Sequence, residues 1–407
     1  MTGDQGATEL RRGWLLILAG LVGTGCGISG ISIYTVGVFT KPLADTFGWS
    51  RAEIQGLLTC YVAGVLIGGP IVGAIMDRRG VRGVTVVSSL GFGLGLAVLG
   101  LGTTNLFQFY AIGVLSGAIG AGTTSITWSR AIMSEFKAKR GFALGLALTG
   151  SGICAAIVPT YSTWLVATYG WRFAYVGLAI LPALIAAPVA WVVLGKLGNT
   201  IGRVDQPVRP ETGVTLKEAV RGYAFWGIGI GLFFAGLGTS GVAPHLIPLL
   251  TDRGLSPMEA AQIATFLGVA VVAGRVVAGY LVDRFWPPGV AAVVLGIPAI
   301  AAIILTGEDN SRVTITIAAM MVGFAGGAEF DLLAFLTARY LGFKQYGLIY
   351  GCMYGLFVTA TGLSPVAVGM VFDNLGTYVP ALYAISACFV ASAVMMLTLG
   401  RAKQVQA

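Results

Sequence analysis

Long apolar segments without a single charge constrain the fold of this chain more than any other feature. A helix needs about 20 mostly apolar residues to cross about 30 Å of membrane hydrocarbon. Barrel strands would instead alternate polar and apolar residues over about 10 positions, which these segments do not do. The sequence therefore predicts an all-α membrane protein. The charge-free segments of spanning length are Gly13–Thr40, Ile54–Met76, Gly83–Ser129, Gly141–Trp171, Phe173–Gly195, Gly222–Thr251, Phe285–Gly307, Gln345–Phe372 and Asn374–Gly400.

Three stretches bring the predicted number of transmembrane helices to twelve. The segment Gly83–Ser129 is long enough for two helices and is interrupted near its middle by the polar residues 103–105. Two further segments, Ala260–Val282 and Val313–Ala338, are apolar apart from three charged side chains.

The composition excludes several classes of soluble protein. Charged residues make up 10% of the 407 positions, against about 25% in soluble domains, and the mean hydropathy is +0.85. So few charges could not cover the surface of a soluble domain of this size. A cytosolic enzyme, a nucleic-acid-binding protein and a disordered scaffold are therefore excluded.

The basic residues predict the orientation in the membrane. With both termini in the cytoplasm, 18 of the 25 Lys and Arg residues fall in cytoplasmic segments, five in outer segments and two within spans. This distribution follows the positive-inside rule, so the net charge of +8 reflects topology. We expect a multi-pass protein of a bacterial-type cytoplasmic (inner) membrane without a cleavable signal, because the polar start leads into a run long enough to span. The five cysteines lie in apolar spans without metal-ligand spacing, so no metal or cofactor is expected.

A polar stretch at 196–221 divides the chain into two halves of six predicted helices each. The predicted domains are an N-terminal bundle at 1–195, a cytoplasmic linker at 196–221 and a C-terminal bundle at 222–407. Within the linker, Thr215 and Glu218 have the spacing of a capping box for a short helix. Two six-helix repeats with a substrate site between them are typical of secondary transporters.

The loop after the second span carries the first family resemblance. The segment from Gly73 to Arg82, GAIMDRRGVR, resembles the G-x-L-x-D-R-x-G-R-R signature of the major facilitator superfamily, and GYLVDR at 279–284 resembles its degenerate repeat. Five segments resemble the bacterial monocarboxylate-porter branch, which is related to oxalate and monocarboxylate transporters: YTVGVFTKPL at 34–43, FGWSR at 47–51, KRGFALG at 139–145, YGWR at 169–172 and RYLG at 339–342 with YG at 346–347. The resemblance implies a twelve-helix major facilitator fold that transports a small organic carboxylate.

Arg275 is the sharpest candidate for substrate binding. A charge inside a span costs about 2.5–3.5 kcal/mol on insertion scales, so such residues face a partner or a water-filled cavity. Arg275 precedes Asp283 by 8 residues, which places it about 12 Å from the cytoplasmic end of its helix. Its planar fork of donors matches a carboxylate. We expect it to anchor the substrate, as the family resemblance also implies; the alternative is a permanent ion pair with an acid on a neighbouring helix.

Glu329 and Asp331 are the candidates for proton coupling. Asp331 precedes Arg339 by 8 residues, so Asp331 and Arg275 are expected at the same distance from the cytoplasmic ends of their helices. Residues two apart on a helix project about 200° apart, so the two acids face different directions. An acid beside an arginine that is alternately free and bound to substrate changes its proton affinity. At least one of the two is expected to carry the proton; the alternative is a fixed ion pair that holds the two helices together.

At three positions this chain has a different residue from the transporters that it resembles. Animal monocarboxylate transporters have an aspartate where this chain has Val271 and a lysine where it has Tyr34. The second cation of the oxalate transporter corresponds to Met353. A proton acceptor must therefore be Glu329 or Asp331, with uniport left open, and a single central cation favours a monocarboxylate over a dicarboxylate.

Aromatic residues within the spans are candidates to line the substrate cavity, with ordinary packing between helices as the alternative. They are Tyr34, Trp128, Phe330, Tyr350, Tyr354 and Phe357.

A third set is assigned to gating. The resemblance implies that Asp77 latches against the start of the eleventh helix, where a helix N-terminus favours negative charge. Arg130 either serves a cavity or reaches the cytoplasmic surface. His245 lies between two prolines that make a helix end irregular. The gating candidates are Asp77, Arg78, Arg82, Asp283, Arg284, Arg130 and His245.

Together these features predict a monomeric secondary transporter that moves a small organic monocarboxylate with a proton by alternating access. Its partners are the carboxylate, the proton and the lipid bilayer, with no nucleic acid. Two alternatives stay open: an anion exchanger or uniporter for an oxalate-like dicarboxylate, and a transporter-like receptor that binds ligand without moving it. The sequence shows no nucleophile–base pair or metal cluster, so an enzyme is not expected.

Overall fold

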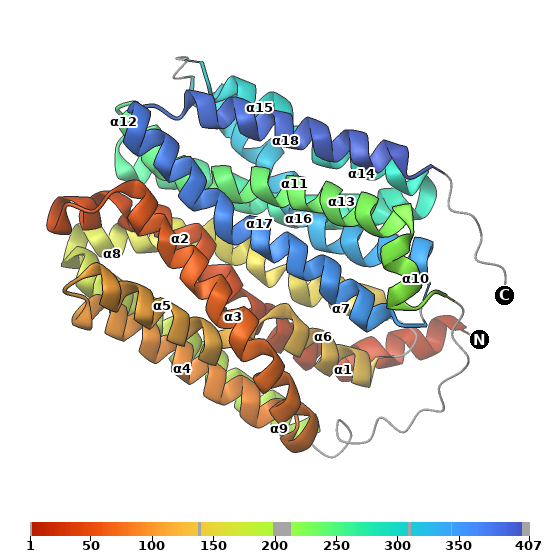
Figure 1. The fold of residues 1–407 in the computed structure, drawn as a ribbon. Helices are drawn as coiled ribbons and strands as arrows, with labels where there is room; N and C mark the ends of the chain where they lie inside the picture. Colours follow the sequence, from red (N-terminus) through yellow and green to blue (C-terminus); the bar gives the residue numbers. More distant parts are fainter. Residues whose placement is uncertain (1, 137–139, 198–212, 308–310, 343, 401–407) are drawn as a thin grey trace. The chain divides into compact units, whose positions relative to one another are not determined.

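The computed structural model describes the chain except for residues 1, 137–139, 198–212, 308–310, 343 and 401–407. The described residues are almost entirely helical, and among them β-structure is limited to one isolated bridge between Gly213 and Gly342. The chain divides into two compact units, Met1–Asp205 and Gln206–Ala407. Figure 1 colours the first unit from red to yellow and the second from green to blue.

The first unit contains two long helices that are interrupted within apolar segments. The first is interrupted between Gly25 and Ile28, and the second at 121–124, where a short 3₁₀ turn replaces the α-helix. The elements of this unit are α1 (Thr2–Gly25), α2 (Ile28–Phe47), α3 (Arg51–Arg79), α4 (Val81–Gly102), α5 (Leu106–Gly120), η1 (Ala121–Thr123), α6 (Ser125–Glu135), α7 (Arg140–Leu148), α8 (Gly150–Ile180), the π-helical η2 (Leu181–Ala186) and α9 (Ala187–Leu197).

The second unit begins with the short helix that the sequence predicts. The Thr215 hydroxyl accepts a hydrogen bond from the backbone N–H of Glu218, and the Glu218 carboxylate accepts one from the N–H of Thr215, so the predicted capping box is confirmed. The elements are α10 (Leu216–Arg221), α11 (Tyr223–Val242), η3 (Ala243–His245), α12 (Leu246–Asp252), α13 (Pro257–Arg284), α14 (Pro287–Gly296), α15 (Pro298–Ile304), α16 (Arg312–Leu341), α17 (Tyr346–Leu375) and α18 (Val379–Thr398).

Eleven described segments are long and apolar enough to cross a membrane. One of them, Ala143–Gly195, has 53 residues, more than twice the length that one crossing requires. Gly170 divides it, because its φ of 77° lies in the region that favours glycine and breaks the helix there. The long segment therefore supplies two crossings, in agreement with the predicted twelve helices.

Glycines bring an equivalent pair of helices into backbone contact in each unit. A Cβ atom added to Gly327 of α16 would lie 2.0 Å from the carbonyl oxygen of Val271 in α13, and one added to Gly274 would lie 2.0 Å from that of Phe324. In the first unit, a Cβ atom added to Gly117 of α5 would lie 2.4 Å from the carbonyl oxygen of Tyr61 in α3, and one added to Gly64 would lie 2.2 Å from that of Val114. Each of these four residues in the second unit follows its counterpart in the first by 210 positions, so the two units repeat one packing motif.

Candidate functional site

The glycine contact between α13 and α16 places two charged side chains beside each other. Arg275 directly follows Gly274, and Asp331 lies about one turn after Gly327. Small residues allow membrane helices to pack at close range, where van der Waals contact holds them together. The two charges are therefore held by a tightly packed pair of helices rather than by loops.

Arg275 and Asp331 form an open ion pair. The Nε atom of Arg275 lies 3.8 Å from Oδ2 of Asp331, and the side chains are 6% and 30% exposed. A charge-assisted hydrogen bond would be about 2.7–2.9 Å long. The Nε atom of Arg275 is buried without a hydrogen-bond partner among the residues that the structure describes. The acid thus balances the charge of Arg275 while leaving its Nε without a hydrogen bond to any described residue.

Glu329 belongs to a different contact of the same helix. It is buried, and its Oε1 accepts a hydrogen bond of 2.9 Å from the hydroxyl of Thr239 in α11. Asp331 instead faces Arg275 of α13. The two acids of α16 therefore approach different neighbouring helices, as their expected separation of about 200° requires.

A surface of aromatic rings adjoins the ion pair. Tyr346, Tyr350 and Tyr354 recur at every fourth position of α17, and their rings stack with centroids 5.7 and 6.1 Å apart. Phe330, the neighbour of Asp331 in the chain, lies 5.9 Å from the ring of Tyr354 and 5.0 Å from that of Phe357. The phenol of Tyr350 is within electrostatic range of both Asp331 and Arg275. A buried cation, two acids and flat apolar rings thus occur together in the second unit.

The comparison with known families decides the class of protein that carries this arrangement. The family model described as Major Facilitator Superfamily matches residues 22–365. The chain belongs to the Major Facilitator Superfamily. It is therefore a multi-pass membrane protein, and its family and fold are those of transporters rather than of enzymes.

Two relatives and one solved structure are similar to this chain over most of its length. It is 25% identical to monocarboxylate transporter 13 of Bos taurus over 95% of this chain and 89% of that protein. It is 23% identical to a gallate transporter of Pseudomonas putida, over 82% and 83% of the two chains. A crystal structure of a bacterial homolog to the human lysosomal transporter Spinster, inward-facing and occupied, superposes with a TM-score of 0.62 at 19% identity, over 96% of this chain and 95% of the other. That likeness shows the major facilitator fold.

Two predicted substrate-binding residues lie in the first unit, away from the ion pair in the chain. Tyr34 is half-buried on α2. Trp128 of α6 is 1% exposed and belongs to the hydrophobic core around α1. Its ring covers Gly23, where an added Cβ atom would lie 2.0 Å from the indole. This position supports the packing alternative for Trp128, and substrate binding by either residue stays a prediction.

The predicted gating residues of the first unit lie at the end of α3, at the start of α4 and on α6. Arg78 is exposed in the last turn of α3, whereas the Asp77 side chain lies outside the described residues. The guanidinium of Arg82 lies 3.8 Å above the ring of Trp191, and its Nε donates a hydrogen bond of 3.0 Å to the Trp191 carbonyl. Arg82 therefore links α4 to α9 within the first unit. Arg130 is half-buried on α6.

In the second unit, Asp283 and Arg284 are exposed at the end of α13, where Arg284 lies 4.2 Å over the ring of Tyr280. His245 is buried in the irregular turn η3 between α11 and α12. Its Nε2 donates a hydrogen bond of 2.8 Å to the Pro365 carbonyl, because that oxygen can only accept, and its Nδ1 lies 3.3 Å from the hydroxyl of Tyr378. His245 thus joins η3 to α17. The gating roles of these residues stay predictions.

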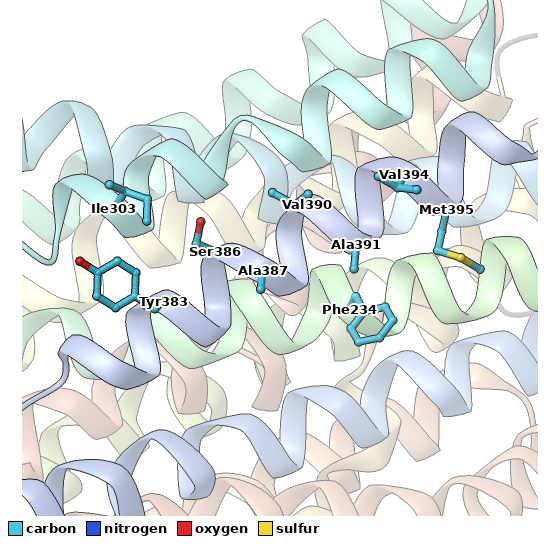
Figure 2. Close-up of a pocket in the computed structure, with 9 residues that line it drawn as sticks. All are labelled: Phe234, Ile303, Tyr383, Ser386, Ala387, Val390, Ala391, Val394 and Met395. Carbon is cyan, nitrogen blue, oxygen red and sulfur yellow. The ribbon is translucent and has the colours of Figure 1, made fainter.

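A cavity of about 580 Å³ lies apart from the ion pair, along α18. Phe234 of α11 and Ile303 of α15 flank α18 there (Figure 2), and Val390 and Val394 are half exposed. The hydroxyl of Ser386 donates to the Ala299 carbonyl, so it is already occupied. The lining has no charged side chain and fits an apolar chain of the bilayer better than a carboxylate.

Two residues of the site were not singled out from the sequence. Thr239 lies in a glycine-rich apolar segment. A threonine in such a segment does not indicate a functional site unless the residue of α16 that faces it is known. Tyr346 could have been found, because it extends the four-residue spacing of Tyr350 and Tyr354 by one turn.

Proposed function

We propose that this chain is a secondary transporter that moves a small organic monocarboxylate together with a proton by alternating access. The observation that carries the proposal is the open ion pair, in which a buried guanidinium lies 3.8 Å from its counter-ion instead of being closed upon it. A buried arginine of this kind is costly within a membrane unless an anion completes its hydrogen bonds. We also propose that the protein lies in the cytoplasmic membrane with both termini inside, on the basis of the distribution of its basic residues.

Arg275 is the proposed anchor for the carboxylate. A planar guanidinium binds both oxygens of a carboxylate through parallel hydrogen bonds, a geometry that an ammonium group does not reproduce. One buried cation matches one carboxylate, and Asp331 beside it repels a second negative charge. The arrangement thus supports a monocarboxylate over a dicarboxylate.

Glu329 and Asp331 are the proposed proton carriers. When a substrate carboxylate binds Arg275, the cation is shared between two anions, and Asp331 is stabilised less in its charged form. Uptake of a proton by either acid then offsets the negative charge that the bound substrate adds. Binding of the anion and binding of the proton thereby favour each other, which is the requirement for symport.

The ring cluster supports an aromatic acid as the preferred substrate. Phe330 lies beside Asp331 on α16, and Tyr350 and Tyr354 lie on the neighbouring α17. A carboxylate held by Arg275 would therefore have its own ring near this cluster. Aromatic pairs add about 0.5–1.5 kcal/mol beyond the burial of their area. One relative of this chain is named a gallate transporter, and gallate is a benzoate derivative.

The test is uptake into proteoliposomes containing the purified protein, with benzoate, 4-hydroxybenzoate, lactate and oxalate as labelled probes. We expect uptake of a monocarboxylate that is driven by an inward proton gradient, with the benzoates ahead of lactate. Arg275→Lys and Arg275→Gln should each abolish uptake, whereas the exposed Arg221→Gln control should retain it.

Each alternative function predicts a different result in the same assay. Normal uptake by Arg275→Lys would refute the anchor. Oxalate counterflow without pH dependence would instead identify an anion exchanger. Saturable binding of a probe without flux would identify a receptor. A pH response that persists in both Glu329→Gln and Asp331→Asn would refute the proton assignment.

A further inference from the structure

The hydroxyl of Thr239 faces two acceptors but has a single proton. Its Oγ1 lies 2.9 Å from Oε1 of Glu329 and 3.2 Å from the carbonyl oxygen of Ala235, one turn earlier on α11. Thr239 and Glu329 are 7% and 4% exposed. A hydroxyl donates one hydrogen bond and accepts up to two. Thr239 therefore donates to Glu329 or to Ala235, but not fully to both.

The protonation state of Glu329 decides between these two arrangements. An ionised carboxylate only accepts, so the Thr239 proton points to Glu329, and this charge-assisted bond is the stronger of the two. A protonated Glu329 has an O–H of its own, which can donate to Oγ1 of Thr239. The Thr239 proton then turns to the Ala235 carbonyl. In both states every O–H in the pair has an acceptor.

We infer that Thr239 is the positioning residue that stabilises Glu329 in both protonation states by reversing the direction of their shared hydrogen bond. The inference rests on the proposed role of Glu329 in proton coupling. It assigns to α11, which carries no Asp, Glu, Lys or Arg within Tyr223–Val242, a direct part in the protonation of α16.

The other charged and titratable groups around α16 have partners other than Glu329. On α13 the facing cation is Arg275, and its ion-pair partner is Asp331. On α17 the hydroxyl of Tyr346 donates to the Ala334 carbonyl of α16. The other facing groups of α17 are Tyr350 and Tyr354, which stack on one another. The helices α14 and α15 contain no titratable residue. Within the described part of the chain, Thr239 is the hydrogen-bond partner that Glu329 has.

The test measures the proton on Glu329 directly. Infrared spectra of the reconstituted protein are recorded as the pH is stepped, and the carbonyl band of protonated Glu329 is identified by its loss in Glu329→Gln. In Thr239→Val the ionised form loses a stronger bond than the neutral form, so the midpoint should move up by about one pH unit. Thr239→Ala should give the same shift, and Thr239→Ser should restore the native midpoint. Thr337→Val, which removes a buried hydroxyl of α16 bonded to the Leu333 carbonyl, is the matched control and should not shift it.

Three results would overturn the inference. They are a native midpoint in Thr239→Val and Thr239→Ala, a shift in Thr239→Ser as large as theirs, and the absence of any Glu329 band between about pH 4 and pH 10. Uptake assays separate this inference from the proposed function. If the midpoint shifts as expected but uptake ignores pH, proton coupling fails and the inference stands. If uptake responds to pH through Glu329 but Thr239→Val titrates normally, the inference alone fails.

Discussion

A single methyl group at the contact between α13 and α16 should disable the site without touching a charged residue. In Gly327→Ala the new Cβ atom would lie 2.0 Å from the backbone carbonyl oxygen of Val271, and ordinary contact begins at 3.4 Å. A backbone atom cannot rotate away as a side chain can, so the helices themselves must separate. Overpacking of this kind costs about 1–3 kcal/mol. Since Arg275 and Asp331 are already 3.8 Å apart, the same movement weakens their interaction further.

The neighbouring glycine provides the control. In Gly326→Ala the nearest atom to the new Cβ is Cγ2 of Thr239 at 3.9 Å, which is an ordinary contact. We expect Gly327→Ala to lower the midpoint of thermal unfolding in detergent and to reduce proteoliposome uptake at least tenfold, since misplacement of binding groups by about 1 Å has effects of up to about 100-fold. Gly326→Ala should behave as the native protein. Equal midpoints and equal uptake for the two variants would refute the argument that backbone contact positions the ion pair.

Two further predictions concern structure away from the ion pair. His245→Phe removes the donor to the Pro365 carbonyl and should destabilise the second unit by about 1 kcal/mol, seen as a lower unfolding midpoint; an unchanged midpoint would show that this bond does not stabilise the fold. The backbone and hydroxyl of Thr215 lower the pKa of Glu218 below its ordinary 4.5, so its stabilisation of α10 is present above that value and is lost as the pH falls through the lowered pKa. The protection factors of the amides at 216–221, which compare measured with intrinsic exchange rates, should therefore fall in acid in the native protein. Equal protection factors in the native protein and in Thr215→Ala at neutral pH would contradict this.

Much of the fold was predictable because it depends on local sequence. The polar residues 103–105 predicted a boundary within one long apolar run, and α4 ends at Gly102 while α5 begins at Leu106. The interruption at 121–124 was not predicted, because glycine and threonine are also common inside membrane helices. A contact with a distant part of the chain accompanies it: the hydroxyl of Thr123 accepts a hydrogen bond of 3.0 Å from the N–H of Ile28, at the start of α2.

The candidate site, like the fold, was predictable from the sequence only in part. Counting residues from the helix ends placed Arg275 and Asp331 at one depth, and the structure has them in an ion pair. This worked because rise along a helix is fixed and both counts start from charged ends. The bond between Thr239 and Glu329 depends on how α11 is rotated against α16, and no regular spacing in either segment encodes that rotation.

The repeated packing of the two units shows which part of the site is particular to the second. Because counterparts lie 210 positions apart, Arg275 corresponds to Val65 and Asp331 to Ala121. Both units therefore keep the glycine contact between equivalent helices, whereas the ion pair occurs in one of them. A charge within a span costs about 2.5–3.5 kcal/mol, so a repeat that merely holds helices together gains nothing from it. Since the packing persists in the first unit without the charges, the charges of the second are not needed for packing, and this argues for substrate and proton binding as their role.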